Sequence, residues 1–389
     1  MKTFDIIMFN MSNYSEWQGG VSNRNWHVLK QLLARPEVGK ILAVDYLPLT
    51  WKRALRMYKE DLVMNLDRGQ VLKRGLGSKL TKLSDKLYVY SDINFFWRPQ
   101  ATIRRIKAIS MKLNFGDTVL WSFFPSVASY WQNMGQKLTV FDAVDNWLLH
   151  SSYQKQQNEL KKSYEHIQKE ADIIFAVSQN LVHWFGNQPN VYWISNGVDL
   201  KHYQQEYPLV NRDIADLARP IIGYIGVIQE RVDLGLVKFL AEKNPDKSLV
   251  MVGPVWNEQD EAKLALEKYP NVFFLGYKSY QEAPLYIQQF DIGLVPHQTS
   301  GHSSSTDPMK IYEYLACGKP VVATENIGAE QFKEIIGLAN GYEHFNKLVN
   351  QFLSEDNEVL RSARRDFVKK YSWYNTVTKM LDIINAKLD

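Results

Sequence analysis

Short apolar runs alternate with amphipathic stretches along most of this chain. In its first half the runs are FDIIMF, KILAVDY, DTVLWSF, KLTVFDAV, IIFAVS and NVYWISN, and residues 23–33 and 157–171 between them have a helical pattern. Strands that alternate with helices are typical of a parallel sheet with helices on both faces. The first half therefore predicts an α/β domain.

The alternation restarts in the second half. PIIGYIGVI, SLVMVGP, NVFFLGY, FDIGLVP and KPVVAT read as strands, and residues 234–243 and 262–268 read as helices. Residues 204–219 lack a clear period and suit a connection between domains. The pattern thus predicts a second α/β domain that follows the first.

A helical pattern closes the chain. Its apolar positions recur at helical intervals on one face and are Trp373, Val377, Met380 and Ile384. We expect one domain over residues 1–195 and another over residues 196–369, with residues 370–389 completing the first domain as a helix.

Composition narrows the class of protein. The chain has 389 residues, of which 45% are hydrophobic, and a formal net charge of +4, which predicts no nucleic-acid partner. Cys317 is the only cysteine, so no internal disulfide is expected. No apolar run approaches the roughly 18 residues that span a bilayer, and the first residues read as a strand rather than a signal peptide. These features favour a cytoplasmic protein.

Positive charge is concentrated between residues 51 and 86. Ten Lys or Arg occur there with four acids: Lys52, Arg53, Arg56, Lys59, Arg68, Lys73, Arg74, Lys79, Lys82 and Lys86 with Glu60, Asp61, Asp67 and Asp85. Trp51, Leu55 and Leu62 are interspersed. The segment fits peripheral contact with an anionic membrane, at the inner face of the plasma membrane, and it equally fits a solvated helical insertion.

The stretch SSSTDPMKIYEYLACGKPVVAT predicts a loop, a short helix and a strand. Asp307 is a candidate N-cap, Pro308 suits the first helical position, and Gly318 can end the helix. The serine loop before it, residues 301–305, then lies at the carboxyl end of the strand DIGLVP. Ligands bind at this edge of open α/β sheets, and the N–H groups of a helix start attract phosphate.

Lys310 and Glu313 lie three positions apart on this helix and share a face. That face offers a cation to phosphate and a carboxylate to sugar hydroxyls. The alternative is an ordinary ion pair between the two side chains, and the spacing alone favours neither interpretation.

Arg231 lies in the loop between the strand GYIGVI and a helix that Asp233 can cap. A guanidinium at this edge would neutralise a departing diphosphate, although a solvated loop arginine has the same sequence signature. Gly223 and Gly226 do not form G-x-G-x-x-G, and no Walker sequence occurs. Dinucleotide and P-loop sites are therefore poorly supported.

Two further candidates lie in the first half. Gly19 and Gly20 precede a predicted helix that carries Arg24, and paired glycines either let a ligand approach the backbone or simply make a tight turn. Asp145 follows the strand KLTVFDAV, where a carboxylate can hold an acceptor hydroxyl or serve as a turn residue. Asp142, three residues earlier, is expected to orient the loop.

No metal site is expected from the sequence. His297 and His302 share one loop, but no cysteine cluster, H-E-x-x-H pattern or D-x-D motif accompanies them.

SNGVDLKHY, GYIGVIQERVDL, FDIGLVPHQ and DPMKIYEYLACGKPVVAT occur in this order and resemble the nucleotide-sugar half of retaining GT-B glycosyltransferases of the family 4 type. WQGGVSNRNWHVL and YSWYNTV are similar to the acceptor-side glycine loop and the closing helix of the same family. The resemblance covers nearly the whole chain and is strongest over residues 174–324. It implies two Rossmann-like domains with parallel sheets that face across a cleft, with the donor bound mainly by the second domain and the acceptor by the first.

The resemblance also implies roles for donor-side residues. Glu313 matches the glutamate that binds the ribose hydroxyls of the donor, and Arg231 and Lys310 would be the cations beside the diphosphate. The loop and the helix start that hold the diphosphate would contribute Gly226, Ser305 and Thr306.

For the base and the acceptor the implied positions are less specific. Gly276 and Tyr277 would lie near the base of the donor. Asp145 stands where many relatives carry a histidine beside the reacting sugar. The acceptor-side loop would contribute Gly19, Gly20 and Arg24.

Two positions depart from the family pattern. The first acid of the E-x7-E motif falls on Ser305, and the usual Gly-Arg pair after the first donor-domain strand reads Gly226-Val227. Loss of the acid changes the contacts to the transferred sugar, and Arg231 is a candidate replacement for the missing arginine.

The expected activity is transfer of a hexosyl-type sugar from a UDP-, GDP- or dTDP-linked donor to a hydroxyl of a cell-surface polysaccharide or lipid-linked glycan. Configuration would be retained, and no metal or other cofactor would be needed. The alternatives are a nucleotide-sugar epimerase or hydrolase on the same fold and, given Ser305 and Val227, a catalytically silent subunit that binds sugar nucleotides. An NAD-dependent oxidoreductase fits less well because the dinucleotide glycine spacing is absent.

Overall fold

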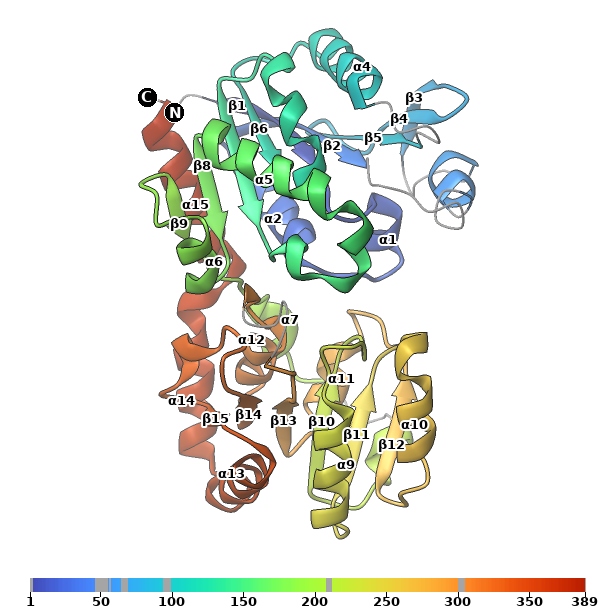
Figure 1. Ribbon diagram of the computed structural model, residues 1–389, viewed down its shortest axis with the longest axis vertical. Helices are drawn as coiled ribbons and strands as arrows, with labels where there is room; N and C mark the ends of the chain where they lie inside the picture. Colours follow the sequence, from blue (N-terminus) through green and yellow to red (C-terminus); the bar gives the residue numbers. More distant parts are fainter. Residues whose placement is uncertain are drawn as a thin grey trace. The chain divides into compact units, whose positions relative to one another are not determined.

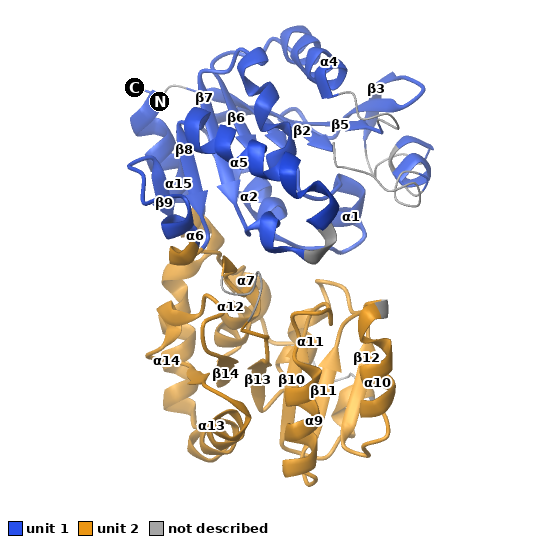
Figure 2. Cartoon of the chain, viewed as in Figure 1, with its two compact units in different colours: residues 1–177, 181–194, 377–389 blue, residues 178–180, 195–376 orange. Residues whose placement is uncertain are grey.

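The structure is a computed structural model that describes residues 3–45, 55, 57–63, 69–93, 99–207, 212–299 and 305–388. The chain divides into two compact units (Figure 2). Unit 1 comprises Met1–Val177, Leu181–Ile194 and Val377–Asp389, and unit 2 comprises Ser178–Asn180 and Ser195–Thr376. The main division thus falls between residues 194 and 195, one residue before the position expected from the sequence.

Unit 1 is built on a sheet whose nine described strands have the order β3-β4-β5-β2-β1-β6-β7-β8-β9 (Figure 1). The seven strands from β5 to β9 in this order are parallel, whereas β4 pairs antiparallel with both β3 and β5. The strands are β1 Phe4–Phe9, β2 Val38–Asp45, β3 Gln70–Arg74, β4 Ser78–Lys82, β5 Leu87–Asp92, β6 Thr118–Ser122, β7 Leu138–Ala143, β8 Ile173–Ala176 and β9 Val191–Trp193.

Helices cover the sheet of unit 1. Every residue of β5, β6, β7 and β8 is buried, which is why these strands read as nearly continuous apolar runs. The described helical elements are α1 Tyr14–Gln18, α2 Arg24–Leu33, the π-helix η1 Tyr58–Val63, α4 Pro99–Lys112, α5 Gln157–Glu170, α6 Gln179–Trp184 and α15 Trp373–Leu388, with 3-10 segments η2 Pro125–Asn133, η3 Trp147–Leu149 and η4 Ser151–Gln156. The first residues of two of these helices, 179–180 of α6 and 373–376 of α15, belong to unit 2.

Unit 2 contains a six-stranded sheet of parallel strands in the order β12-β11-β10-β13-β14-β15. The strands are β10 Ile221–Ile225, β11 Ser248–Val252, β12 Val272–Gly276, β13 Ile292–Val295, β14 Val321–Thr324 and β15 Gly337–Ala339. An apolar cluster joins one face of this sheet to α9, α10 and α13.

The helical elements of unit 2 include two long helices, α13 and α14, that the sequence analysis did not identify. The described elements are α7 Leu200–Gln204, α8 Arg212–Ala215, α9 Leu234–Lys243, α10 Asp260–Leu266, α11 Ala283–Ile287, α12 Met309–Ala316, α13 Tyr342–Glu355 and α14 Glu358–Val368, with 3-10 segments η5 Asn257–Gln259, η7 Glu330–Phe332 and η8 Lys369–Tyr371.

Part of the basic segment over residues 51–86 lies outside the described residues, including Trp51, Lys52, Arg53, Arg56 and Arg68. Residues 70–82 form the antiparallel β3–β4 hairpin, so the expected helical insertion is wrong for this part. Leu62 does not face solvent but packs with Met57 and Ile93 in a small apolar cluster. None of the helices in the described ranges is long and apolar enough to cross a bilayer.

Candidate functional site

Helix α12 starts on a buried polar anchor. Pro308 is its N-cap rather than its first helical residue, and no side chain caps it. The buried Asp307 carboxylate instead accepts hydrogen bonds from Asn196 N at 2.6 Å, the Tyr312 hydroxyl at 2.8 Å and Gln331 Nε2 at 2.9 Å. The expected capping role of Asp307 is therefore wrong, because its carboxylate fastens the helix start to the segment that follows β9.

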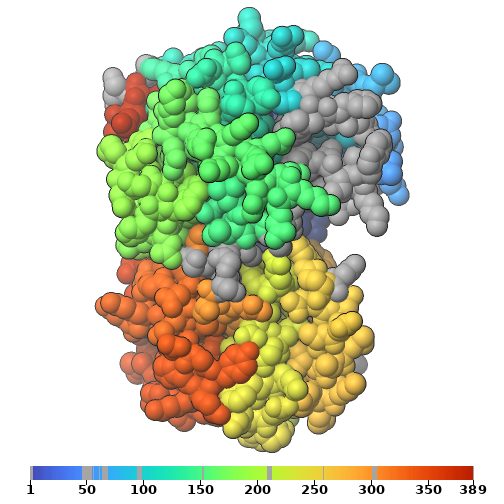
Figure 3. Space-filling model, in the orientation of Figure 1, coloured from blue at the N-terminus to red at the C-terminus, as the bar shows by residue number. Residues whose placement is uncertain are grey.

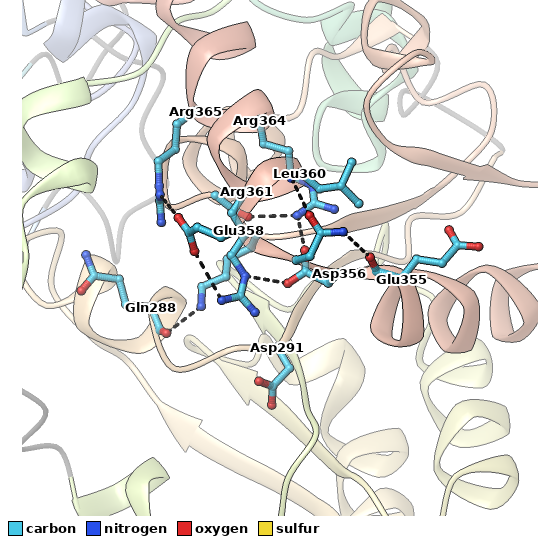
Figure 4. Close-up of polar contacts among 12 residues, drawn as sticks. Gln288, Asp291, Glu355, Asp356, Glu358, Leu360, Arg361, Arg364 and Arg365 are labelled. Atoms are coloured by element: carbon cyan, nitrogen blue, oxygen red, sulfur yellow. Dashed lines mark hydrogen bonds and ion pairs between the residues drawn. The ribbon is translucent and has the colours of Figure 1, made fainter.

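The other end of α12 is held by α14. Gly318 follows the helix at φ 75°, as the sequence predicts for a terminating glycine, and its carbonyl accepts a hydrogen bond from Arg364 Nη1 at 3.2 Å. Arg364 and Arg361 both pair with Asp356 (Figure 4). These contacts fix α12 at both ends, so the side chains along it have little freedom to shift as a group.

Helix α12 also lies close to the sheet of unit 2. A Cβ atom at Gly293 of β13 would stand only 2.5 Å from the ring of Tyr314, so glycine is needed for this approach. The Tyr314 hydroxyl accepts a hydrogen bond from Ile225 N at 3.0 Å, at the end of β10. The helix is thereby placed beside the carboxyl ends of the strands.

At that edge, a glycine ends or directly follows each of three neighbouring strands. Gly226 follows β10 at φ 137°, Gly253 follows β11 at φ 138°, and Gly276 ends β12 at φ 68°. A Cβ atom at Gly253 would collide with the Gly226 carbonyl, and one at Gly226 would collide with the Lys310 stem. The edge therefore consists of backbone in conformations that favour glycine, which leaves room for a ligand close to the chain.

Lys310 projects from the first turn of α12 over this edge. Its Nζ lies 5.1 Å from the centre of the Tyr224 ring, within the range of a cation–π contact. Burial and the nearby Arg231 charge lower the pKa of Lys310 to about 7, while Glu313 opposes this change. The ammonium is thus held in a position where an anion would stabilise its charge.

Arg231 is the second cation of the site. Gln229, with its amide oxygen turned toward the guanidinium, accepts hydrogen bonds from Arg231 Nε at 2.9 Å and Nη2 at 3.1 Å. Its loop is fixed further because Gln298 N donates to the Arg231 carbonyl at 2.8 Å, and Asp233 caps α9 through Leu236 N at 3.0 Å, as predicted. The guanidinium is therefore supported rather than a freely solvated loop group.

Glu313 lies on α12 near Lys310. Burial raises the pKa of the Glu313 carboxyl, and a hydrogen bond from Tyr203 and the charge of Lys310 oppose that rise. The charges of Lys310 and Glu313 thus act on each other, although no ion pair within 4 Å joins these two described residues. The carboxylate and the ammonium lie on one face of the helix, close enough to interact electrostatically.

Tyr203 supports Glu313 from α7. Its side chain is buried, and its carbonyl accepts a hydrogen bond from Cys317 Sγ at 3.3 Å and from Gln288 Nε2 at 3.4 Å. Gln288 in turn accepts at its own carbonyl from Lys319 Nζ at 2.8 Å, a contact drawn in Figure 4. The aromatic side chain beside the carboxylate is therefore anchored through its backbone.

The donor-loop candidates fall partly outside the described residues, which exclude 300–304. Ser305 is buried, and its carbonyl accepts a hydrogen bond from Ser178 Oγ at 2.9 Å. Thr306 is also buried, and its hydroxyl donates to the Ile327 carbonyl at 3.4 Å. Tyr277, which follows Gly276, is 53% exposed. These positions surround the same strand edge, and their contacts with a donor remain predictions.

The candidates in unit 1 have different surroundings. Gly19 caps the end of α1 and Gly20 follows at φ 95°, so the pair closes a short helix before α2 begins at Arg24. The buried Arg24 donates from Nε to Asp142 Oδ1 at 2.8 Å. Asp145 accepts from Asn146 N at 2.7 Å in the turn after β7. Ligand contacts at these residues stay predictions.

Four residues around this edge were not predicted from the sequence: Tyr203, Tyr224, Gln229 and Gly253. A signal for Gly253 was present, because IIGYIG, SLVMVG and VFFLG each place a glycine at the end of an apolar run. Tyr224, Gln229 and Tyr203 gave no such signal, since their positions depend on packing. In the part of the chain that the structure describes, no group of three His, Cys, Asp or Glu could hold a metal ion.

Comparison with known proteins matches most of unit 2 to a protein family. A family model described as Glycosyl transferases group 1 matches residues 219–356. The putative teichuronic acid biosynthesis glycosyltransferase TuaH of Bacillus subtilis (strain 168) is 30% identical over 163 residues, which are 42% of this chain and 39% of TuaH. The GDP-mannose-dependent monoacylated alpha-(1-6)-phosphatidylinositol monomannoside mannosyltransferase of Corynebacterium glutamicum is 24% identical over 254 residues, 58% of this chain and 65% of that protein. Each match spans less than two thirds of the relative.

Solved structures resemble the chain over nearly its whole length. Anabaena Alr3699/HepE in complex with UDP and glucose has a TM-score of 0.65 at 14% identity, covering 99% of this chain and 100% of that one. Sucrose-phosphate synthase from Thermosynechococcus elongatus has a TM-score of 0.71 at 14% identity, covering 98% of each chain. At these identities the likeness defines the fold, which is GT-B. The chain therefore has the GT-B fold, and its residues 219–356 match the family model of the glycosyl transferases group 1.

Proposed function

We propose that this protein transfers a sugar from a nucleotide-diphosphate donor to a hydroxyl acceptor with retention of configuration. The observation that carries the proposal is the strand edge of unit 2, where Lys310 and Arg231 flank a backbone of glycines and Glu313 lies on the same helix as Lys310. Two cations with one carboxylate suit a ligand that carries a diphosphate and a diol.

In this proposal each donor-side group has a separate role. Lys310 and Arg231 would neutralise the charge that develops on the leaving diphosphate, because fixed cations in a partly buried site stabilise such charge strongly. Glu313, as a carboxylate, would accept hydrogen bonds from the two ribose hydroxyls. The glycine edge would let the diphosphate approach the backbone. No step in this scheme requires a metal ion.

The acceptor is proposed from the relatives. One is named for teichuronic acid biosynthesis and the other for a phosphatidylinositol mannoside substrate. A cell-surface polysaccharide or lipid-linked glycan, bound by unit 1 with Asp145 and the Gly19–Gly20 turn, is therefore the proposed acceptor. UDP-sugars are the first donors to test, because HepE was solved with UDP.

The test is a thermal-shift screen with UDP-, GDP- and dTDP-sugars. A donor at one hundred times its dissociation constant should stabilise the native protein by about 2.7 kcal/mol. Glu313→Ala should abolish the shift for the true donor, whereas Glu261→Ala on the exposed surface of α10 is the matched control and should retain it. An unchanged shift in Glu313→Ala would contradict the assigned role.

A second candidate is a catalytically silent subunit that binds a sugar nucleotide. The buried Ser305, which occupies the position of the family's first acid, favours it. The two candidate functions differ because the transferase forms product and the silent subunit does not. Incubation of a stabilising donor with lipid-linked glycans, followed by mass spectrometry, should give a glycosylated product for the transferase and none for the silent subunit. Release of free sugar without acceptor would indicate a hydrolase.

A further inference from the structure

The β3–β4 hairpin extends unit 1 with an antiparallel edge that the parallel part of the sheet does not need. It lies at the outer end of the strand order, and Figure 1 and Figure 3 show it at the margin of the unit in mid-blue. The ladder is regular except for a bulge between Val71 and Lys73. Leu72 is therefore the bulged residue, and it is 41% exposed.

The turn of this hairpin presents an apolar side chain to solvent. Leu76, between Gly75 and Gly77, is 99% exposed, which is the highest exposure among the described large apolar residues. Turns of hairpins normally carry polar residues such as Asn-Gly or Asp-Gly. Leu76 contributes nothing to the core of the unit, and with Leu72 it leaves two large apolar side chains exposed on one hairpin.

Exposed cations adjoin these leucines. Lys73 and Arg74 are exposed at the end of β3, and no acid lies within residues 69–84. Helix η1 packs against β4 and adds Tyr58, 42% exposed, and Val63, 56% exposed. The sequence of unit 1 as a whole has 27 Lys and Arg and 18 Asp and Glu, whereas unit 2 has 19 and 24. The apolar tip thus belongs to the basic unit.

We propose that the tip of the β3–β4 hairpin docks on an anionic phospholipid surface. Leu72 and Leu76 enter the interface, and Lys73 and Arg74 contact the headgroups. Basic residues beside exposed apolar ones match the charge and the apolar interior of such a surface. A second copy of the chain is a poorer match, because the bulge and like charges along β3 oppose pairing of two such edges. The inference is independent of the proposed reaction.

The experiment measures binding of the full chain to vesicles, without donor or acceptor. Flotation with phosphatidylcholine vesicles is compared with flotation after part of the lipid is replaced by phosphatidylglycerol. We expect binding only with the anionic lipid, weakened by salt. Leu76→Asp should lower the partition coefficient on the order of tenfold. Lys73→Ser combined with Arg74→Ser should lower it on the order of 25-fold, since each basic residue contributes about fivefold.

Leu264→Asp is the matched control, because Leu264 is 60% exposed on α10 of unit 2. It should bind anionic vesicles as the unchanged protein does. Circular dichroism melts of all variants check that the hairpin substitutions leave the fold intact. Equal binding of Leu76→Asp and the unchanged protein, or binding that ignores phosphatidylglycerol, would overturn the proposal. So would a dimer in light scattering that Leu76→Asp dissociates, since it would identify a second copy as the occupant.

Discussion

The carboxyl edges of the two sheets are built in opposite ways. In unit 1, β2 ends at Asp45, β5 ends at Asp92, and β7 carries Asp142 one residue before its end. In unit 2, the ends of β10, β11 and β12 meet Gly226, Gly253 and Gly276 instead. One edge is filled by acidic side chains, and the other is left to the backbone.

Each aspartate of the first edge is bound within unit 1. Asp45 accepts from Asn10 Nδ2 at 2.7 Å. Asp92 accepts from the Thr102 hydroxyl at 2.6 Å, and Asp142 pairs with Arg24. These carboxylates tie loops and helices to the sheet, so their contacts stabilise the fold. At the second edge, Lys310 lies near one further cation, Arg231, and near the acid Glu313, so the charge of these three groups is positive in sum and suited to an anion.

The largest expected effect on stability concerns the carboxyl edge of the sheet in unit 1. Arg24→Met removes the guanidinium that neutralises the buried Asp142, and we expect the free energy of unfolding to fall by about 3–5 kcal/mol because an uncompensated carboxylate is left in the interior. Urea denaturation measures the loss. Combining Arg24→Met with Asp142→Leu should recover most of it. A loss below about 1 kcal/mol would remove the contrast between the two edges.

The next effect tests the glycines of the second edge. Gly253→Ala should lower the free energy of unfolding by about 2–3 kcal/mol, because the new Cβ would collide with the Gly226 carbonyl at a backbone conformation that already disfavours alanine. Gly276→Ala is the matched control, since nothing lies within 4 Å of its Cβ position, and it should cost about 1 kcal/mol. Equal losses in thermal melts would mean that backbone conformation alone, and not close approach, selects glycine here.

The smallest effect on stability, and the clearest on binding, is expected at Lys310. Lys310→Met should leave the free energy of unfolding unchanged or higher, because removing water from the half-buried ammonium disfavours folding. Calorimetry should show donor affinity reduced on the order of tenfold to hundredfold, the range of a charge-assisted hydrogen bond. A large loss of stability with unchanged donor affinity would mean that Lys310 is a structural group like Arg24.

The pH dependence of donor binding sharpens the same test. The pKa of Lys310 is lowered to about 7 in the native protein and returns to about 10.4 on unfolding. Between these values the unfolded state binds more protons, so the cost of Lys310 to stability shrinks as the pH rises. Donor affinity should change in the opposite sense and fall above pH 7 as the ammonium is lost. Lys310→Arg keeps its charge and should flatten this fall; an equally steep profile in the variant would assign it to another group.

Local signals in the sequence were enough to predict several features of unit 2. Helix α9 begins and ends at the predicted residues 234 and 243, with Asp233 as its cap. Gly318 ends α12 as predicted, and Lys310 and Glu313 share a face of that helix. In each case the information lies within one turn of the residue, in a capping side chain, a glycine or a helical spacing.

Other features depend on partners that are distant in the sequence. Asp307 looked like a cap, but Asn196 and Gln331, more than twenty residues away on either side, bind its carboxylate instead. The ring of Tyr224 beneath Lys310 reads only as part of an apolar strand. The hairpin was missed because QVLKRGLGSKLTK lacks strict alternation, and its bulge breaks the period of two. Tertiary packing decides such positions, and local pattern does not record it.

The division of the chain into discontinuous units affects how the protein is synthesised and which fragments of it can be expressed. Ser178, which holds the Ser305 carbonyl, belongs to unit 2 although unit 1 residues flank it in the sequence, and Val377–Asp389 return to unit 1 after unit 2 is complete. Neither unit is one continuous stretch, so a ribosome releases the last piece of unit 1 only after it has synthesised the whole of unit 2. An expression fragment that begins at residue 195 lacks the hydroxyl that donates to the Ser305 carbonyl, and a fragment that stops at residue 194 lacks the final helix. Each unit therefore has all of its segments only in the full-length chain.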